Sequence, residues 1–273
     1  MNITKIMVAS DFTTVSDNAI DHAIKLASAT NAEVYVLHIA RELAEVNTAK
    51  LKLGQQIEKR NPGSITTHVM VKIGNFISEI GKAAEEVGAQ LIIMGTHGPK
   101  GIIQTVTGGD AMKVVSHSEK PFIVVQEKGI KETGYDHIVV PMDMTEDSKQ
   151  KLDEVADVAK YFNSKVYIIA KHETDKGLYV KLKNNVIFAK KYFSEKNIEM
   201  AITITEPKTD FEKEIIKYAK ENDADLIAII NSLNWNIFKS LFASRREEQI
   251  ITNEEQIPVL VVNPVDVKSG YTM

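Results

Sequence analysis

The chain repeats its own pattern at a nearly constant spacing, which restricts it to a duplicated fold. Residues 6–13 (IMVASDFT) return 132 positions later as residues 138–145 (IVVPMDMT), and further matches follow at offsets of 132 and 135. Such spacing without long gaps indicates a domain copied in tandem. With 273 residues in total, each copy is long enough to form its own core. We therefore expect domains at residues 1–128 and 135–265, with the boundary in the polar stretch 127–136.

The two copies differ most where the first is rich in glycine. Gly95 and Gly98 are followed, after nine residues, by Gly108 and Gly109. The aligned residues 230–244 contain no glycine and carry large apolar side chains instead: Leu233, Trp235, Ile237, Phe238, Leu241 and Phe242. Side chains of this size would block a phosphate site, so we expect a packed loop or a contact surface for another protein, anchored by Trp235. The alternative is a short helix that folds back, with Trp235 covering the core.

Composition argues against several classes of protein. The chain has no cysteine, which rules out disulfides and thiolate metal sites and favours an intracellular protein. No apolar run approaches about 18 residues, and the N-terminus leads straight into a predicted strand. We therefore expect a cytoplasmic protein with no membrane partner. A net charge of −4 gives no basic surface for nucleic acid, and the histidines show no metal-ligand spacing.

Strand-like and helix-like segments alternate in both copies. Apolar, β-branched runs predict five strands in each: 3–9, 33–39, 65–71, 90–94 and 121–125, then 137–142, 165–170, 200–205, 225–230 and 258–262. Between them lie helical patterns, including one that Ser16 would cap and one that begins near Phe76 and stops at Gly88. This alternation predicts an α/β fold in which each copy is a doubly wound, parallel sheet.

Residues suited to ligand binding follow the predicted strands of the first copy. Asp11 follows the first strand, Ile39 ends the second, and the stretch from Gly95 to Gly109 follows the fourth and leads into a helix beginning near Asp110. Doubly wound sheets bind ligands beyond the carboxyl ends of their strands. Glycines permit positive φ and close backbone approach, and a helix N-terminus offers free N–H groups to an anion. We interpret this region as a phosphate cradle.

The glycine spacing, the preceding LIIM, the terminal PFIVV and the opening IMVASDFTTVSDNAI together resemble the universal stress protein family. The resemblance is strong in the first copy and weaker in the second. It implies two tandem Rossmann-like domains of the adenine nucleotide alpha hydrolase-like type, each with a five-stranded parallel sheet. It also implies ATP or a related adenine nucleotide as ligand, and stress-linked regulation without general catalytic activity. Carried over by position, it implies nucleotide contacts at Ala9, Asp11, Ile39, Met94, Gly95, His97, Gly98, Gly108, Gly109 and Asp110.

Some positions depart from the family pattern or have a simpler explanation. Gly109 stands where a serine or threonine hydroxyl usually contacts phosphate, and losing one neutral hydrogen bond weakens binding by about tenfold at most. The carboxylate of Asp110 would repel a phosphate unless Mg²⁺ bridges the two. Asp11 and its repeat Asp143 would both serve equally well to brace a turn. His97 has no nucleophile or acid tied to it by sequence, so we expect no catalytic residue.

These features lead to one expected function and two alternatives. We expect a stress-response regulatory protein whose first domain binds ATP or a related nucleotide, and whose second domain is a structural or partner-binding copy. The alternatives are a scaffold that binds no nucleotide and a weak ATP hydrolase. The last strand of each copy, 121–125 and 258–262, should lie at a sheet edge, so we expect the halves to pair through these strands. We also expect chains to associate into a homo-oligomer.

Overall fold

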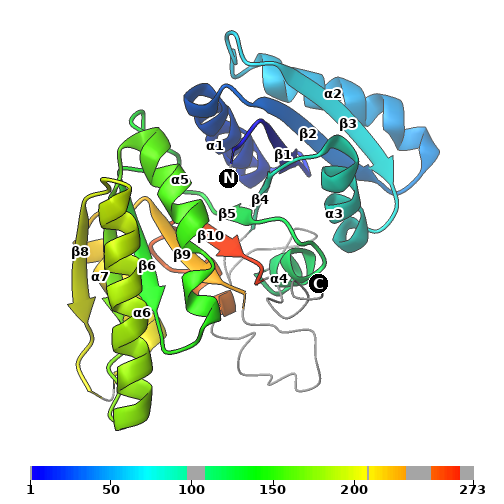
Figure 1. Cartoon of the computed structure of the whole chain (residues 1–273). Coiled ribbons are helices and arrows are strands. Elements are labelled where there is room, and N and C mark those ends of the chain that lie inside the picture. Colours follow the sequence, from blue (N-terminus) through cyan, green and yellow to red (C-terminus); the bar gives the residue numbers. More distant parts are fainter. Residues whose placement is uncertain (1, 97–107, 208, 232–246, 265–273) are drawn as a thin grey trace, which may run out of the picture.

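Ten strands form one continuous sheet with helices packed on both of its faces (Figure 1). The computed structural model describes residues 2–96, 108–207, 209–231 and 247–264. The strand order is β3-β2-β1-β4-β5-β10-β9-β6-β7-β8. All neighbours are parallel except β5 and β10, which are antiparallel. Two five-stranded parallel halves therefore share a single sheet, which confirms the predicted α/β class.

Every predicted strand end lies within two residues of the observed one. The central strands are almost entirely buried, which explains why continuous apolar runs identified them, whereas the edge strands β3 and β8 are more exposed. The ten strands are β1 (Lys5–Ala9), β2 (Glu33–Ala40), β3 (Thr67–Ile73), β4 (Leu91–Gly95), β5 (Phe122–Val125), β6 (His137–Met142), β7 (Lys165–Ala170), β8 (Met200–Ile204), β9 (Leu226–Ile230) and β10 (Val259–Val262).

The helices between the strands follow the predicted order. They include α1 (Thr14–Thr30), α2 (Val46–Glu58), α3 (Phe76–Val87), α4 (Gly108–Ser116), α5 (Leu152–Phe162), α6 (Lys176–Glu195) and α7 (Phe211–Glu221), with 3-10 turns η1 (Leu43–Glu45) and η2 (Asp147–Lys149); residues 247–251, before β10, are also helical. The predicted cap of the first helix is wrong. Thr13, not Ser16, caps α1, because its side chain accepts a hydrogen bond from the backbone N–H of Ser16. α3 ends at Gly88 in the left-handed conformation, as predicted.

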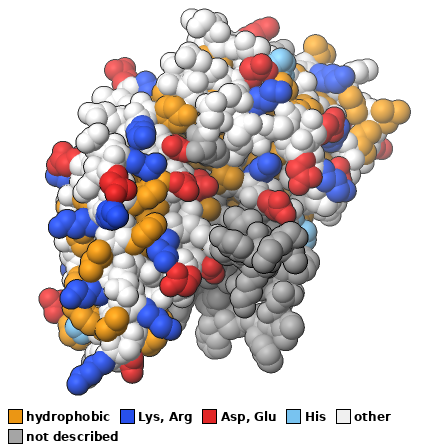
Figure 2. All heavy atoms as spheres, viewed as in Figure 1, with side chains coloured by type: hydrophobic (Ala, Val, Ile, Leu, Met, Phe, Trp, Pro, Cys, Tyr) orange, Lys and Arg blue, Asp and Glu red, His pale blue; other side chains and the backbone are white. Residues whose placement is uncertain are grey.

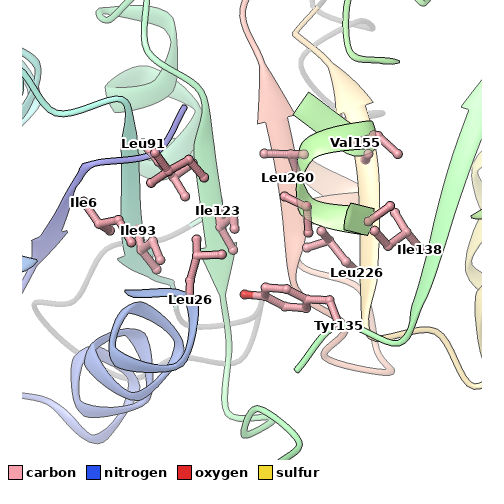
Figure 3. Packing of buried hydrophobic residues seen from close by; sticks show 14 of the residues in the cluster. Ile6, Leu26, Leu91, Ile93, Ile123, Tyr135, Ile138, Val155, Leu226 and Leu260 are labelled. Carbon is pink, nitrogen blue, oxygen red and sulfur yellow. The ribbon is translucent and has the colours of Figure 1, made fainter. Parts of the chain in front are cut away.

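Each face of the sheet has its own hydrophobic core. Side chains of α1, α2, α5 and α6 fill one face, and those of α3, α4 and α7 fill the other. The first core continues across the middle of the sheet, where Ile123 of β5 lies opposite Leu260 of β10 (Figure 3). No helix in the described parts of the chain combines the length and the apolar character needed to cross a membrane.

The polar stretch between the halves is held firmly against α1. The side-chain amide of Asn18 donates to the carbonyl oxygens of Gln126 and Lys128 at 2.6 and 2.7 Å. His22 lies between the Lys128 carbonyl, 3.3 Å from Nε2, and the hydroxyl of the fully buried Tyr135, 2.8 Å from Nδ1. The stretch at the predicted domain boundary is therefore tied to α1 by hydrogen bonds and to the core by Tyr135.

Candidate functional site

Two adjoining hollows open where β1, β2 and β4 end. Their volumes are about 920 and 60 Å³, and we call them together the first-half cleft. Doubly wound sheets hold their ligands at this place, outside the carboxyl ends of the strands. Six of the residues predicted from the sequence line the cleft: Ala9, Asp11, Ile39, Met94, Gly95 and Asp110. Residues far apart in the sequence thus converge on one surface.

Asp11 braces the turn between β1 and α1. Its Oδ1 accepts hydrogen bonds from the backbone N–H and the hydroxyl of Thr13, at 3.1 and 2.6 Å. In the second half, Asp143 accepts the same two hydrogen bonds from Thr145, at 2.9 and 2.6 Å. A turn-bracing role is therefore common to both copies. Among the described residues, the other carboxylate oxygen of Asp11 accepts no hydrogen bond, so it is available to a ligand in the cleft.

An aromatic pair forms one wall of the cleft. Phe12 has a φ of 67°, an unusual conformation for a bulky residue, and its ring lies over that of His38 with centroids 4.4 Å apart. His38 Nδ1 lies 2.8 Å from the carbonyl oxygen of Ser10, which fixes the ring. Lys52 Nζ lies 5.3 Å from the centre of the Phe12 ring. Sequence reasoning missed Phe12, although an aromatic residue directly after the strand-end aspartate was a usable signal.

Charged side chains of both signs line the larger hollow. Arg41 and Lys52 provide positive charge beside Asp11, Glu45 and Asp110. Neither cation was predicted as a site residue, because Arg41 lies just after β2 and Lys52 lies on α2, outside the glycine-rich stretch. Among the residues that are described, no group of three or more histidine or acidic side chains could hold a metal ion by itself.

Gly95 is required by packing. A Cβ atom at this position would lie 2.7 Å from Val15 Cγ1 and 3.0 Å from the backbone carbonyl carbon and oxygen of Val15. The end of β4 can therefore approach the first turn of α1 only because it carries glycine. Positive φ, which we expected of these glycines, does not apply to Gly95. His97 and Gly98 lie outside the described residues.

A helix follows the glycine-rich stretch, as predicted. α4 starts at Gly108, so Gly108, Gly109 and Asp110 form its first turn. The expectation that the helix would begin near Asp110 agrees with these bounds to within two residues. Asp110 Oδ1 lies 3.1 Å from Lys113 Nζ, one turn further along the helix. The glycines that were predicted to contact phosphate therefore lie in the first described turn of this helix.

The corresponding place in the second half is built differently. Lys151, which aligns with Ala19 at the offset of 132, is buried, and its Nζ lies 3.4 Å from Ser148 Oγ. Burial lowers the pKa of Lys151 to about 8, and the carboxylate of Asp143 opposes this effect. Asn185 donates to the carbonyl oxygens of Asp143 and Thr145, both at 2.8 Å. The expected packed loop with Trp235 lies outside the described residues.

Comparison with known proteins shows the family of the chain. The model of the universal stress protein family matches residues 2–126. A universal stress protein of Methanocaldococcus jannaschii is 30% identical over 139 residues, a match that covers 82% of its length and 45% of this chain. The chain belongs to the universal stress protein family. Universal stress protein YxiE of Bacillus subtilis is 29% identical over 146 residues, covering 98% of its length and 45% of this chain.

A likeness to one solved member of the universal stress protein family extends over both halves. The crystal structure of a universal stress protein from Archaeoglobus fulgidus covers 96% of this chain, and the match covers 97% of that chain. The TM-score is 0.71 at 18% sequence identity, a level at which the likeness concerns the fold alone. The fold over both halves is therefore similar to that of an experimentally determined structure.

Proposed function

We propose that the first-half cleft binds ATP or a related adenine nucleotide as a regulatory ligand. The observation that carries this proposal is the convergence of six family-predicted residues on one cleft at the carboxyl ends of β1, β2 and β4. A volume of about 920 Å³ lies within the usual range for small-molecule sites. Membership of the universal stress protein family adds support, because the family pattern implies such a ligand at these positions.

The chemistry of the lining suggests how a nucleotide would lie. The adenine ring would contact Ile39 and the aromatic side chain of Phe12, which offer apolar surface. The phosphates would extend toward the first turn of α4, where helix N–H groups favour an anion. Arg41 or Lys52 would offset phosphate charge. Asp110 could hold Mg²⁺ against the phosphates, since carboxylate oxygens suit this ion.

The second half would then serve as a structural or partner-binding domain. The buried ammonium group of Lys151 stands close to the turn that, in the first half, borders the cleft. We propose the domain boundaries 1–128 and 135–265, and a cytoplasmic location remains a prediction from the sequence. In the second domain, the side chain of Lys151 would fill the place beyond the strand ends that is open in the first domain.

A nucleotide-independent scaffold is the second candidate function. It is favoured by the identical hydrogen bonds of Asp11 to Thr13 and of Asp143 to Thr145, which explain the first aspartate without any ligand. A weak ATP hydrolase is the third. It would have to use Asp11, Glu45 or Asp110, the acids that line the described part of the cleft, to orient a water molecule.

The nucleotide proposal predicts one binding site in each chain. Titration calorimetry with ATP and Mg²⁺ should give a ratio near one nucleotide per chain, because only the first half carries the glycines of the family pattern. No heat of binding for ATP, ADP or AMP would favour the scaffold. Two equivalent sites would contradict the proposed difference between the halves.

We also propose that the antiparallel contact of β5 with β10 makes each chain a paired unit of two halves. The contact aligns Val124 with Val259 and Phe122 with Val261, all four fully buried. Backbone amides of both strands should exchange slowly with deuterium in the intact chain. Exchange should become fast at the β5 amides that face β10 in a fragment of residues 1–128, whose last strand keeps β4 but has lost its other neighbour. Unchanged protection of β5 in that fragment would contradict the pairing.

A further inference from the structure

One region of the surface gathers most of the exposed large apolar side chains. Ten such side chains are exposed among the described residues, and six of them belong to α6 and β8: Tyr179, Val180, Ile187, Phe188, Ile202 and Ile204. Surfaces this rich in apolar side chains generally mark an interaction site. Figure 2 shows apolar side chains interspersed with basic ones in the region of α6, at the lower left of the molecule.

The outward ridge of α6 carries apolar side chains among polar ones, since Asn184 and Lys191 share it with Val180 and Ile187. Its inner side packs on the sheet through Leu182, Asn185, Ala189 and Phe193. Val180 and Ile187, seven residues apart, therefore lie on the opposite side of the helix, and their side chains are 54% and 53% exposed. Surface helices normally present polar side chains to water at these positions. The ridge thus projects two branched apolar side chains away from the protein.

The edge strand β8 extends this apolar surface. Thr203 bonds to the hydroxyl of Tyr218 on α7, and side chains alternate along a strand, so Ile202 and Ile204 face the other side of the sheet, where α6 packs. Ile204 is 51% exposed. We call α6 together with β8 the α6 surface.

The α6 surface is also strongly positive. α6 carries five lysines and one glutamate, a net charge of +4 in a chain whose total is −4. All five lysines are exposed: Lys176, Lys181, Lys183, Lys190 and Lys191. Within the described part of the chain, only Lys191 has an acidic side chain at ion-pair distance, Glu195 at 3.7 Å. Apolar side chains flanked by unpaired lysines are the composition of helices that lie on anionic membranes.

We propose that the α6 surface docks the protein on the anionic surface of a phospholipid bilayer. A second copy of the chain is disfavoured, because a two-fold contact through α6 would bring ten lysines together. A convex helix ridge needs a matching groove on a protein, whereas lipid headgroups adapt to it. Nucleic acid is disfavoured as the partner, because the exposed apolar side chains of Val180 and Ile187 cannot pair with its phosphates. The earlier expectation of no membrane partner rested on the length of apolar runs, which excludes only a spanning segment.

Vesicle co-sedimentation of the full chain tests the proposal. The protein should bind vesicles of equal parts phosphatidylcholine and phosphatidylglycerol, should not bind pure phosphatidylcholine, and should be released by salt. Ile187→Glu, and the double change of Lys183→Glu with Lys190→Glu, should each weaken binding by roughly tenfold or more. Circular dichroism should show unchanged folding, because these side chains point away from the core.

Matched controls lie on α2, the corresponding helix of the first half. Lys50→Glu and Leu51→Glu introduce the same kinds of change at exposed positions and should leave vesicle binding within about twofold of the original. Three results would overturn the proposal: no binding to anionic vesicles, an equal loss in the α2 variants, or a change from dimer to monomer in Ile187→Glu with vesicle binding intact. The last result would identify a second copy as the occupant.

Discussion

Replacing Gly134 by alanine is expected to destabilise the protein by about 3 kcal/mol, from steric overlap together with a left-handed backbone. Gly134 has a φ of 94°, and a Cβ atom there would lie 2.2 Å from Cδ1 of Phe162. The Phe162 ring cannot move away easily, because it packs edge-on against the buried Tyr135 with centroids 5.4 Å apart. Urea unfolding should show a lower transition midpoint for Gly134→Ala.

Gly129 provides the matched control in the same connecting stretch. The nearest atom to a Cβ at Gly129 is Asn18 Oδ1 at 3.9 Å, an ordinary contact distance. Gly129→Ala should therefore change the free energy of unfolding by less than about 1 kcal/mol. Equal effects of the two substitutions would mean that the connection is not fixed in the way the structure indicates.

Stability should also fall steeply as the pH drops from about 6.5 to 4, and His22 should be a main cause. Burial lowers the pKa of His22 to about 4, from an ordinary value of 6.5, although the hydrogen bond to the Lys128 carbonyl opposes this shift. The neutral ring donates from Nε2 and accepts from the Tyr135 hydroxyl at Nδ1. A protonated ring would have to leave this arrangement or carry an unpaired buried charge.

The sign of the effect follows from proton uptake. Between pH 4 and 6.5 the unfolded chain binds a proton at His22 and the folded chain does not, so acid favours unfolding. The contribution of neutral His22 to the free energy of unfolding is fully present above about pH 6.5. Its loss by pH 4 amounts to about 3 kcal/mol. His22→Leu should be less stable at neutral pH but should lose about 3 kcal/mol less on acidification. If the stability of His22→Leu depended on pH as that of the original protein does, other groups would be the cause of the acid sensitivity.

Much of the fold could be predicted because the strands are buried on both faces. In β1 and β4 nearly every residue is buried, so the sequence shows an unbroken apolar run whose ends match the strand ends. The duplicated pattern then fixed the order of the elements, since the second half repeats the first at an almost constant offset. Residues at strand ends, such as Asp11 and Ile39, converge on the cleft for the same topological reason.

Details that depend on the geometry of single turns could not be predicted in this way. Thr13 rather than Ser16 caps α1, because the Asp11 turn sets where the helix begins. Both hydroxyl residues fit the sequence rule equally well. The cations of the cleft were missed because Arg41 and Lys52 belong to segments without a motif, and only the fold brings them beside Asp11.

ATP titration of Asp11→Asn and Asp143→Asn tests whether a nucleotide binds in the first half and not in the second. Either asparagine can still accept the hydrogen bonds of its threonine, so both turns should remain intact. Asp11→Asn should lower affinity by about tenfold or more, the usual effect of losing a charged hydrogen-bonding group, whereas Asp143→Asn should change it by less than about twofold. Equal affinities in the two variants would contradict the proposed site.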